Sequence, residues 1–144
     1  MTCLPDVNVW ISLAASGHVH RQIAKKWFDG CNEAIVFCRV MEMGLFRLLT
    51  NAKVIGEDVL DVRSAWRVRD SFFEDSRIVF ATEPVDFERS WNHTANQGKI
   101  GPNFWTDGYL ESIYQALDCT LVTFDGALSR RKRVKSLPLA ASGQ

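Results

Sequence analysis

The sequence opens with Met1-Thr-Cys-Leu-Pro-Asp-Val-Asn-Val-Trp-Ile-Ser-Leu13, in which a short apolar run stops at an acid and apolar residues then resume. We interpret this stretch as a strand, the acid Asp6 and a helix. Ligands bind outside the carboxyl ends of the strands in an open α/β sheet, so Asp6 is placed to face a site. Asp is also a favourable residue for capping a helix, and that interpretation stays open.

The rest of the chain continues the alternation of apolar and amphipathic segments. Further strands are predicted at residues 33–39, 77–81, 119–124 and 134–139, the last an edge strand because it contains Pro138. Further helices are predicted at residues 18–29, 40–49, 56–74, 85–94 and 106–117, with a loop at 97–104 and a turn or short helix at 126–133. This alternation predicts an α/β fold in which helices cover both faces of a mostly parallel sheet of four or five strands.

The composition limits the class of protein. A chain of 144 residues fits a single domain, residues 1–144, and 47% hydrophobic with 24% charged residues is typical of a globular chain. Lys plus Arg and Asp plus Glu each number 17, so any attraction to nucleic acid must be local. No apolar run approaches the ~18 residues of a membrane helix, and the order of a signal peptide is missing. We therefore expect a cytoplasmic protein with no membrane partner.

Four acids interrupt apolar patterns at the ends of predicted strands or in the first turns of predicted helices. They are Asp6, Glu42, Asp107 and Asp125. An unpaired buried carboxylate is very unfavourable, and acids that converge on one edge of a sheet raise one another's pKa. A divalent cation removes both penalties, and hard oxygen ligands select Mg²⁺ or Mn²⁺. Each acid also has a simpler interpretation, as a helix cap, a charge at a helix N-terminus or the start of an Asp-Gly turn.

As a set, four segments resemble the acidic motifs of PIN domains, and in particular the VapC-type ribonuclease toxins of type II toxin–antitoxin systems. They are Leu4-Pro-Asp-Val-Asn-Val-Trp-Ile11, Glu42-Met-Gly-Leu-Phe-Arg-Leu-Leu-Thr-Asn51, Thr106-Asp-Gly-Tyr-Leu110 and Leu121-Val-Thr-Phe-Asp125. The resemblance covers essentially the whole chain and implies a PIN-like three-layer α/β/α sandwich. It implies that the four acids are catalytic, and that two polar neighbours support them, Asn8 and Thr123.

The resemblance also implies an activity, the hydrolysis of RNA phosphodiester bonds with Mg²⁺ or Mn²⁺. Asp6 and Asp107 are the expected direct ligands of the metal. Asp125 is expected to bind it directly or through water. Glu42 is expected to orient or deprotonate the attacking water.

Carboxylates repel phosphate, so RNA binding needs cations near the acids. The best candidates follow Asp125 closely and are Arg130, Arg131, Lys132 and Arg133, with Lys135 beyond them. The same run also fits a solvated C-terminal face. Arg39 and Arg47, which flank Glu42, either serve RNA as well or pair with acids of the site or of a partner.

Two competing functions remain. A phosphatase of the haloacid dehalogenase type needs a second acid two residues after its nucleophile, and Asn8 at that position argues against it. A non-catalytic module would use the same acids only to bind metal, RNA or protein. By resemblance, the expected partners are an RNA substrate, a small cognate antitoxin that blocks the acidic cleft, and a second copy of the chain in a homodimer.

Overall fold

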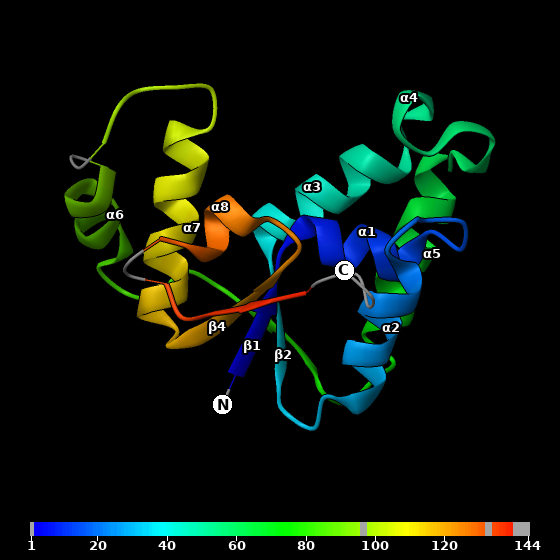
Figure 1. The fold of residues 1–144 in the computed structure, drawn as a ribbon, viewed down its shortest axis with the longest axis horizontal. Coiled ribbons are helices and arrows are strands. Elements are labelled where there is room, and N and C mark those ends of the chain that lie inside the picture. Colours follow the sequence, from blue (N-terminus) through cyan, green and yellow to red (C-terminus); the bar gives the residue numbers. More distant parts are fainter. Residues whose placement is uncertain (1, 96–97, 132–133, 140–144) are drawn as a thin grey trace.

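Five parallel strands form the sheet of the computed structural model, which describes residues 2–95, 98–131 and 134–139. In spatial order, the strands are β3 (Ile78–Ala81), β2 (Ile35–Cys38), β1 (Thr2–Pro5), β4 (Cys119–Thr123) and β5 (Ser136–Pro138) (Figure 1). Each pairing between neighbouring strands is parallel. The predicted parallel sheet is therefore confirmed, including the edge strand that contains Pro138.

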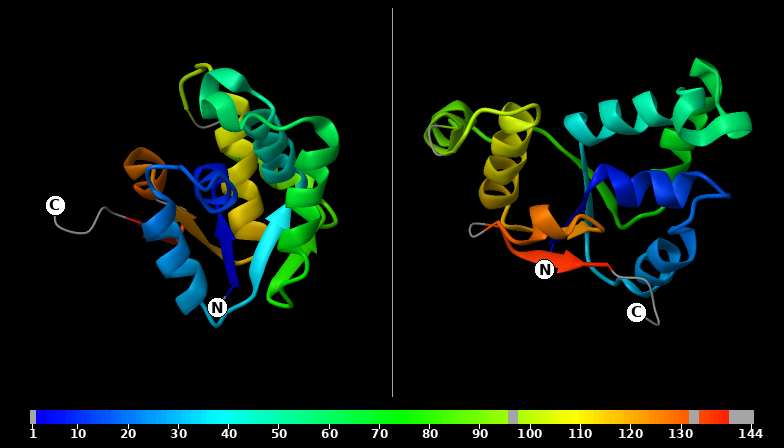
Figure 2. Two further views of the ribbon diagram at one scale, coloured as in Figure 1. Left: turned by 90° about the vertical axis from the view of Figure 1, so that its right-hand side faces the viewer. Right: turned by 45° about the horizontal axis from the view of Figure 1, so that its top comes forward.

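Helices connect the strands and lie on both sides of the sheet, with α2 on one side and α5 on the other (Figure 2). They are α1 (Val7–Ala14), α2 (Arg21–Gly30), α3 (Arg39–Leu49), α4 (Ala52–Ile55), α5 (Val62–Phe72), α6 (Phe87–Ala95), α7 (Phe104–Ala116) and α8 (Gly126–Ser129), with one 3-10 turn, η1 (Gly56–Asp58). In the part of the chain that the structure describes, no helix has the length and apolar character needed to cross a bilayer.

Two apolar clusters fill the spaces between the sheet and the helices on its two faces. Successive side chains of a strand point to opposite faces, so Leu4 of β1 belongs to the larger cluster while Cys3 belongs to the smaller one. The larger cluster packs α3, α5 and α7 against the sheet, and the smaller one packs Ala24 of α2 against the other face. The predicted α/β/α sandwich is confirmed.

Helix α1 is anchored in the core by Trp10, which is fully buried. The centroid of its ring lies 4.6 Å from that of Phe37 and 5.0 Å from that of Phe72, both in edge-to-face geometry. Aromatic pairs of this kind add about 0.5–1.5 kcal/mol each beyond the area that they bury. This packing fixes the direction of α1 and therefore the place of Asp6 at its N-terminus.

The single helix predicted at residues 56–74 is wrong. Gly56 adopts a positive φ of 60° after α4, and a 3-10 turn follows. Asp61 then begins α5 as its N-cap, because its carboxylate accepts a hydrogen bond of 2.7 Å from the backbone N–H of Ser64. Three other helix starts also shift, since α2 begins at Arg21 rather than at residue 18, α6 at Phe87 rather than at residue 85 and α7 at Phe104 rather than at residue 106.

The strand order reverses at β1, which lies between β2 and β4. The chain leaves β1 toward β2, and β4 pairs with the other edge of β1. Beyond the last residue of β1, the N–H of Asp6 donates to the carbonyl of Val122 at 2.8 Å, so the ends of β1 and β4 stay together. A reversal of this kind opens a crevice at the carboxyl ends of the two strands, and Asp6 and Asp125 follow these ends.

Candidate active site

Asp6 is held by two hydrogen bonds at the junction of β1 and β4. One carboxylate oxygen accepts from the N–H of Val7 at 2.7 Å, and the other accepts from the hydroxyl of Thr123 at 3.0 Å. Asp6 is only 6% exposed, so it is both the N-cap of α1 and a buried acid. The two interpretations of Asp6 are therefore compatible.

Thr123 links the two strand ends. Its side chain is fully buried, and its hydroxyl donates to Asp6 while it accepts from the N–H of Asp125 at 2.9 Å. Asp125 itself is exposed and accepts from the N–H of Leu128 at 3.2 Å, in the first turn of α8. Thr123 thus fixes the distance between the Asp6 carboxylate and the start of the loop that carries Asp125.

Asp6, Asp107 and Asp125 act on one another electrostatically. Burial raises the pKa of Asp6, and the charges of Asp125 and Asp107 raise it further, against the lowering effect of its hydrogen bonds with Val7 and Thr123. Burial is also the main reason why the pKa of Asp107 is raised; Arg131 lowers it and Asp125 adds to the rise. Three of the four predicted acids therefore interact electrostatically in this structure.

Arg131 pairs with two acids of α7. Its guanidinium contacts Glu111 at 2.8 and 2.9 Å and Asp107 at 3.6 Å. Glu111 is only 8% exposed and was not predicted from the sequence, although it follows Asp107 by four residues and so lies on the same side of α7. Arg131, predicted to bind RNA, compensates carboxylates in this structure.

The other members of the basic run lie elsewhere or are not described. Arg130 is exposed after α8. Lys132 and Arg133 lie outside the described residues. Lys135 pairs with Asp118 at 2.8 Å, and both side chains are largely exposed. The prediction that this run binds RNA stays a prediction.

Glu42 is buried but points toward α5. It is 2% exposed, and its two carboxylate oxygens pair with Arg39 and, at 2.8 Å, with Arg69. The guanidinium carbon of Arg69 also lies 4.2 Å from the centre of the Phe73 ring. The described contacts thus join Glu42 to two arginines rather than to the three aspartates, and its catalytic role stays a prediction.

Asn8, the second predicted supporting residue, is exposed on α1. Its backbone carbonyl accepts a hydrogen bond of 2.6 Å from the hydroxyl of Ser12. The described contacts of Asn8 are therefore those of a helix residue, whereas Thr123 contacts the acids directly. A supporting role for Asn8 stays a prediction.

The three aspartates fit a divalent cation by donor type and by charge. Their oxygens are hard ligands of the kind that Mg²⁺ and Mn²⁺ prefer. Burial is the main cause of the raised pKa values of Asp6 and Asp107, and the charge of Asp125 adds to both. Among the residues that the structure describes, no three His, Cys, Asp or Glu side chains form a ready-made metal cluster. Arg131 supplies part of the compensating charge in this arrangement.

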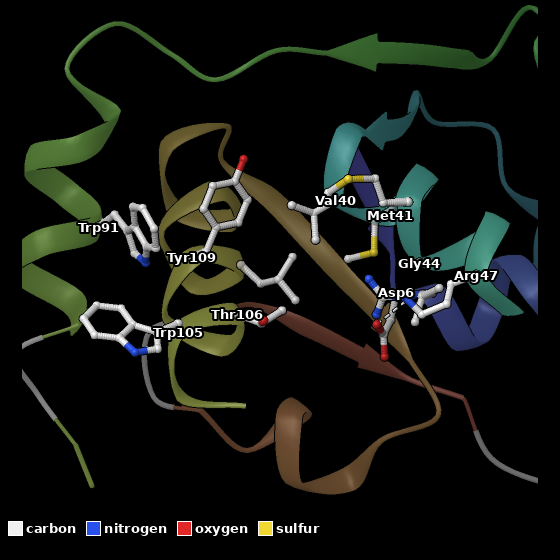
Figure 3. A pocket seen from close by; sticks show the side chains of 12 residues that line it. Asp6, Val40, Met41, Gly44, Arg47, Trp91, Trp105, Thr106 and Tyr109 are labelled. Carbon is white, nitrogen blue, oxygen red and sulfur yellow. Dashed lines mark hydrogen bonds between the residues drawn. The ribbon is translucent and has the colours of Figure 1, made fainter. Parts of the chain in front are cut away.

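A cavity of about 350 Å³ opens beside Asp6. In Figure 3, Asp6 and Arg47 lie on one side of it and Trp91, Trp105 and Tyr109 on the other. A second cavity, of about 340 Å³, is lined by Asp107 and Arg131. The acids therefore border two hollows large enough for parts of a substrate.

The sequence is similar over most of its length to a named ribonuclease. Over 133 residues, which are 88% of this chain and 91% of the relative, it is 38% identical to Ribonuclease VapC41 from two strains of Mycobacterium tuberculosis. The chain belongs to the VapC family of ribonucleases. The resemblance seen in the four acidic motifs is thereby confirmed, although no family model matches the chain.

Solved VapC structures share the fold. The chain superposes with a TM-score of 0.65 on VapC20 of Mycobacterium tuberculosis, a toxin that cleaves the sarcin–ricin loop, at 14% identity over 90% of this chain and 93% of that one. The TM-score is 0.64 for VapBC2 of Rickettsia felis bound to a promoter DNA fragment, at 14% identity over 97% and 100% of the two chains. For a toxin–antitoxin complex from Klebsiella pneumoniae it is 0.60, at 15% identity over 92% and 94%. At such identities the likeness establishes the VapC-type fold.

Proposed function

We propose that this VapC-family chain is a divalent-metal-dependent endoribonuclease and the toxin of a toxin–antitoxin pair. One observation carries the proposal: Asp6 is fixed by Val7 and Thr123 at the point where the strand order reverses, in a field shared with Asp107 and Asp125. Acids gathered in this way at a ligand-binding crevice suit the binding of a cation. The name of the relative, Ribonuclease VapC41, supports RNA as the substrate.

The residues have separate tasks in this reaction. Asp6 and Asp107 would hold a Mg²⁺ or Mn²⁺ ion, and Asp125 would bind it directly or through water. When bound, a divalent cation would supply a water molecule of lowered pKa and stabilise the leaving oxygen of the phosphodiester. Thr123 orients Asp6 by donating to one of its oxygens. Glu42 stays in the proposal as the group that orients the attacking water, which requires its carboxylate to leave one of its two arginines.

The basic side chains near the acids hold the RNA backbone. Arg47 borders the cavity beside Asp6, and Arg130 is exposed where the chain leaves α8. Lys132 and Arg133 complete the proposed RNA-binding run. Arg131 contributes less free charge than the sequence suggested, because Glu111 and Asp107 share it.

The proposed partners are a small antitoxin and a second copy of the chain. Two of the solved neighbours are VapBC2 and a toxin–antitoxin complex, which supports an antitoxin. Exposed apolar side chains recur in the segment that contains α4, η1 and the start of α5, and such side chains suit an interface; they are Val54, Val59, Val62 and Trp66. The homodimer rests on the family resemblance.

Cleavage of total cellular RNA tests the proposed activity. We expect the purified protein to cut RNA with Mg²⁺ and not with EDTA, and mapping of the new 5′ ends to show defined sites. Asp6→Asn should abolish cutting while the melting temperature is retained. Asp29→Asn is the matched control, because Asp29 is an exposed acid on α2 that pairs with Lys25.

Three outcomes would contradict the proposed site or activity. Full cleavage by Asp6→Asn would remove Asp6 from the site. Binding of RNA without any cleavage would favour the non-catalytic module, and hydrolysis of p-nitrophenyl phosphate without RNA cleavage would favour a phosphatase.

A further inference from the structure

The cavity beside Asp6 has an aromatic wall that the proposed metal chemistry does not use. We propose that this cavity binds one nucleobase of the RNA substrate, close to the phosphate that is cut. This inference rests on the proposed ribonuclease function and adds the subsite that selects the base. Four features of the cavity carry it: its wall, its exposed tryptophan, its size and its charge.

The wall is built from three aromatic side chains of α6 and α7, namely Trp91, Trp105 and Tyr109 (Figure 3). The ring of Trp91 is nearly perpendicular to the other two, with centroids 6.3 Å from Trp105 and 5.5 Å from Tyr109. Such a set presents both ring faces and ring edges to a molecule in the cavity. Bases of single-stranded RNA stack on aromatic side chains because every base has a π face.

The wall is held in place from behind. The hydroxyl of Tyr109 donates to Glu83 at 2.7 Å, and its ring contacts Phe87 with centroids 4.9 Å apart. Phe87 is 4% exposed and so belongs to the core. A ring held as Tyr109 is loses little conformational entropy when a base binds.

Trp105 is the exposed member of the wall. It is 61% exposed in the first turn of α7, two residues before Asp107. Large apolar groups exposed beside a cleft mark binding surfaces more often than isolated surface residues do. A base that stacked on Trp105 would cover this ring and would lie next to an acid of the site.

The size and polarity of the cavity fit a nucleotide better than a protein segment. Its volume of about 350 Å³ lies at the small end of the roughly 300–1,000 Å³ typical of small-molecule sites. Val40, Met41 and Leu110 supply apolar lining, and Thr106 is a polar residue of the same lining. An amphipathic helix of a partner needs a longer groove that takes several side chains.

The charge of the cavity is also arranged for a nucleotide. Arg47, exposed on α3, and Asp6 lie opposite the aromatic wall (Figure 3). A nucleotide that places its base against the wall directs its phosphate toward Arg47 and the acid site. The cation counters the repulsion between phosphate and the Asp6 carboxylate, so one ligand meets both ends of the cavity.

Nucleotide binding can be followed at individual tryptophans by NMR of protein labelled with ¹⁵N-tryptophan. The chain has five indole N–H groups, which Trp→Phe variants assign. We expect the four nucleoside 5′-monophosphates, titrated in the presence of Mg²⁺, to shift the signals of Trp91 and Trp105 and to leave that of Trp66 unchanged. Ribose 5-phosphate, which has the phosphate without a base, should shift neither wall signal.

Two results would overturn the base subsite. If no monophosphate moves Trp91 or Trp105, the cavity does not take a base, and its apolar lining is left for a protein partner. If ribose 5-phosphate moves them equally, only the phosphate is bound. Both readouts are independent of cleavage, so a positive result with an inactive protein would separate this subsite from the nuclease proposal.

Binding of single-stranded RNA gives a second test. In the Asp6→Asn background, which keeps the RNA intact, a labelled mixed-sequence 12-nucleotide RNA should bind about fivefold or more weakly to Trp105→Ala, the loss expected for one base stack. Trp105→Phe should retain most of the affinity. Trp66→Ala is the matched control, because Trp66 is a similarly exposed tryptophan (47%) on α5. Equal losses for Trp66→Ala and Trp105→Ala would refute the assignment.

Discussion

Replacing Arg69 with Ala tests whether Glu42 is held as a structural ion pair. Glu42 is almost completely buried, and Arg69, whose side chain is 23% exposed, contacts it at 2.8 Å. Arg39, the other partner, is 62% exposed and better solvated. Arg69→Ala therefore leaves a buried carboxylate with one weakly held cation.

The magnitude follows from the burial of the pair. Removal of one partner of a buried ion pair costs about 3–5 kcal/mol, whereas an exposed pair is worth about 0–1 kcal/mol. Arg69 is partly exposed and Arg39 remains, so we expect a loss of about 2–3 kcal/mol. For a chain of this size that lowers Tm by roughly 5–10 °C.

Urea unfolding and thermal melting measure this loss. Arg63→Ala is the matched control, because Arg63 is exposed on the same helix and should change stability by less than about 0.5 kcal/mol. Glu42→Gln should cost about 1 kcal/mol, because Arg69 keeps Asp70 at 3.2 Å. The double variant Arg69→Ala with Glu42→Gln should cost less than the sum of the two single changes. Equal losses for Arg69→Ala and Arg63→Ala would refute the reasoning.

The same variants test the proposed role of Glu42 in cleavage. At a temperature where every variant is folded, Glu42→Gln should abolish RNA cleavage if this carboxylate orients the attacking water. Retained cleavage by Glu42→Gln, together with the coupling to Arg69, would assign Glu42 to the fold instead.

Three further predictions concern the acids. Thr123→Val removes the hydroxyl that lowers the pKa of Asp6, so the acid limb of the RNA cleavage profile should move to higher pH, whereas Thr123→Ser should restore it. The pKa of Asp107 is raised in the folded protein, so its ionisation opposes folding as the pH rises above the pKa that it has in the unfolded chain. Without metal, Asp107→Asn should therefore raise Tm at pH 7. Calorimetry should show that Mg²⁺ stabilises this variant less than the wild type. Hydrogen bonds from Arg77 lower the pKa of Asp75 to about 2, so the stability that this pair contributes is present above pH 4 and lost between about pH 4 and 2. Acid titration of Asp75→Asn should show a smaller loss over that interval.

The sheet could be predicted because its signal is local. Short apolar segments separated by amphipathic ones imply parallel strands joined by helices, and the acids Asp6 and Asp125 mark the ends of β1 and β4. The break before α5 was missed for a local reason as well. Val59 and Leu60 continue the apolar pattern of the helix, and this pattern outweighed the capping signal of Asp61 with the N–H of Ser64.

The missed features of the site depend on contacts between distant residues. Glu111 is buried and pairs with Arg131, 20 residues later. Glu42 faces α5 because Arg69, 27 residues later, pairs with it. The sequence shows that these side chains are charged, but the partner of each one is set by how the helices pack on the sheet.

The distances around Arg131 bear on how the proposed cation site and RNA site would coexist in a chain with no net charge. Its guanidinium makes two close contacts with Glu111, at 2.8 and 2.9 Å, and a looser one with Asp107, at 3.6 Å. The contact of Arg131 with Asp107 is thus weaker than its contact with Glu111. A cation bound by Asp107 would displace Arg131 from that carboxylate without releasing it from Glu111. Glu111 would therefore keep the Arg131 guanidinium at the edge of the acid site, where its N–H groups could donate to a phosphate of the proposed RNA substrate while Glu111 offsets part of its charge.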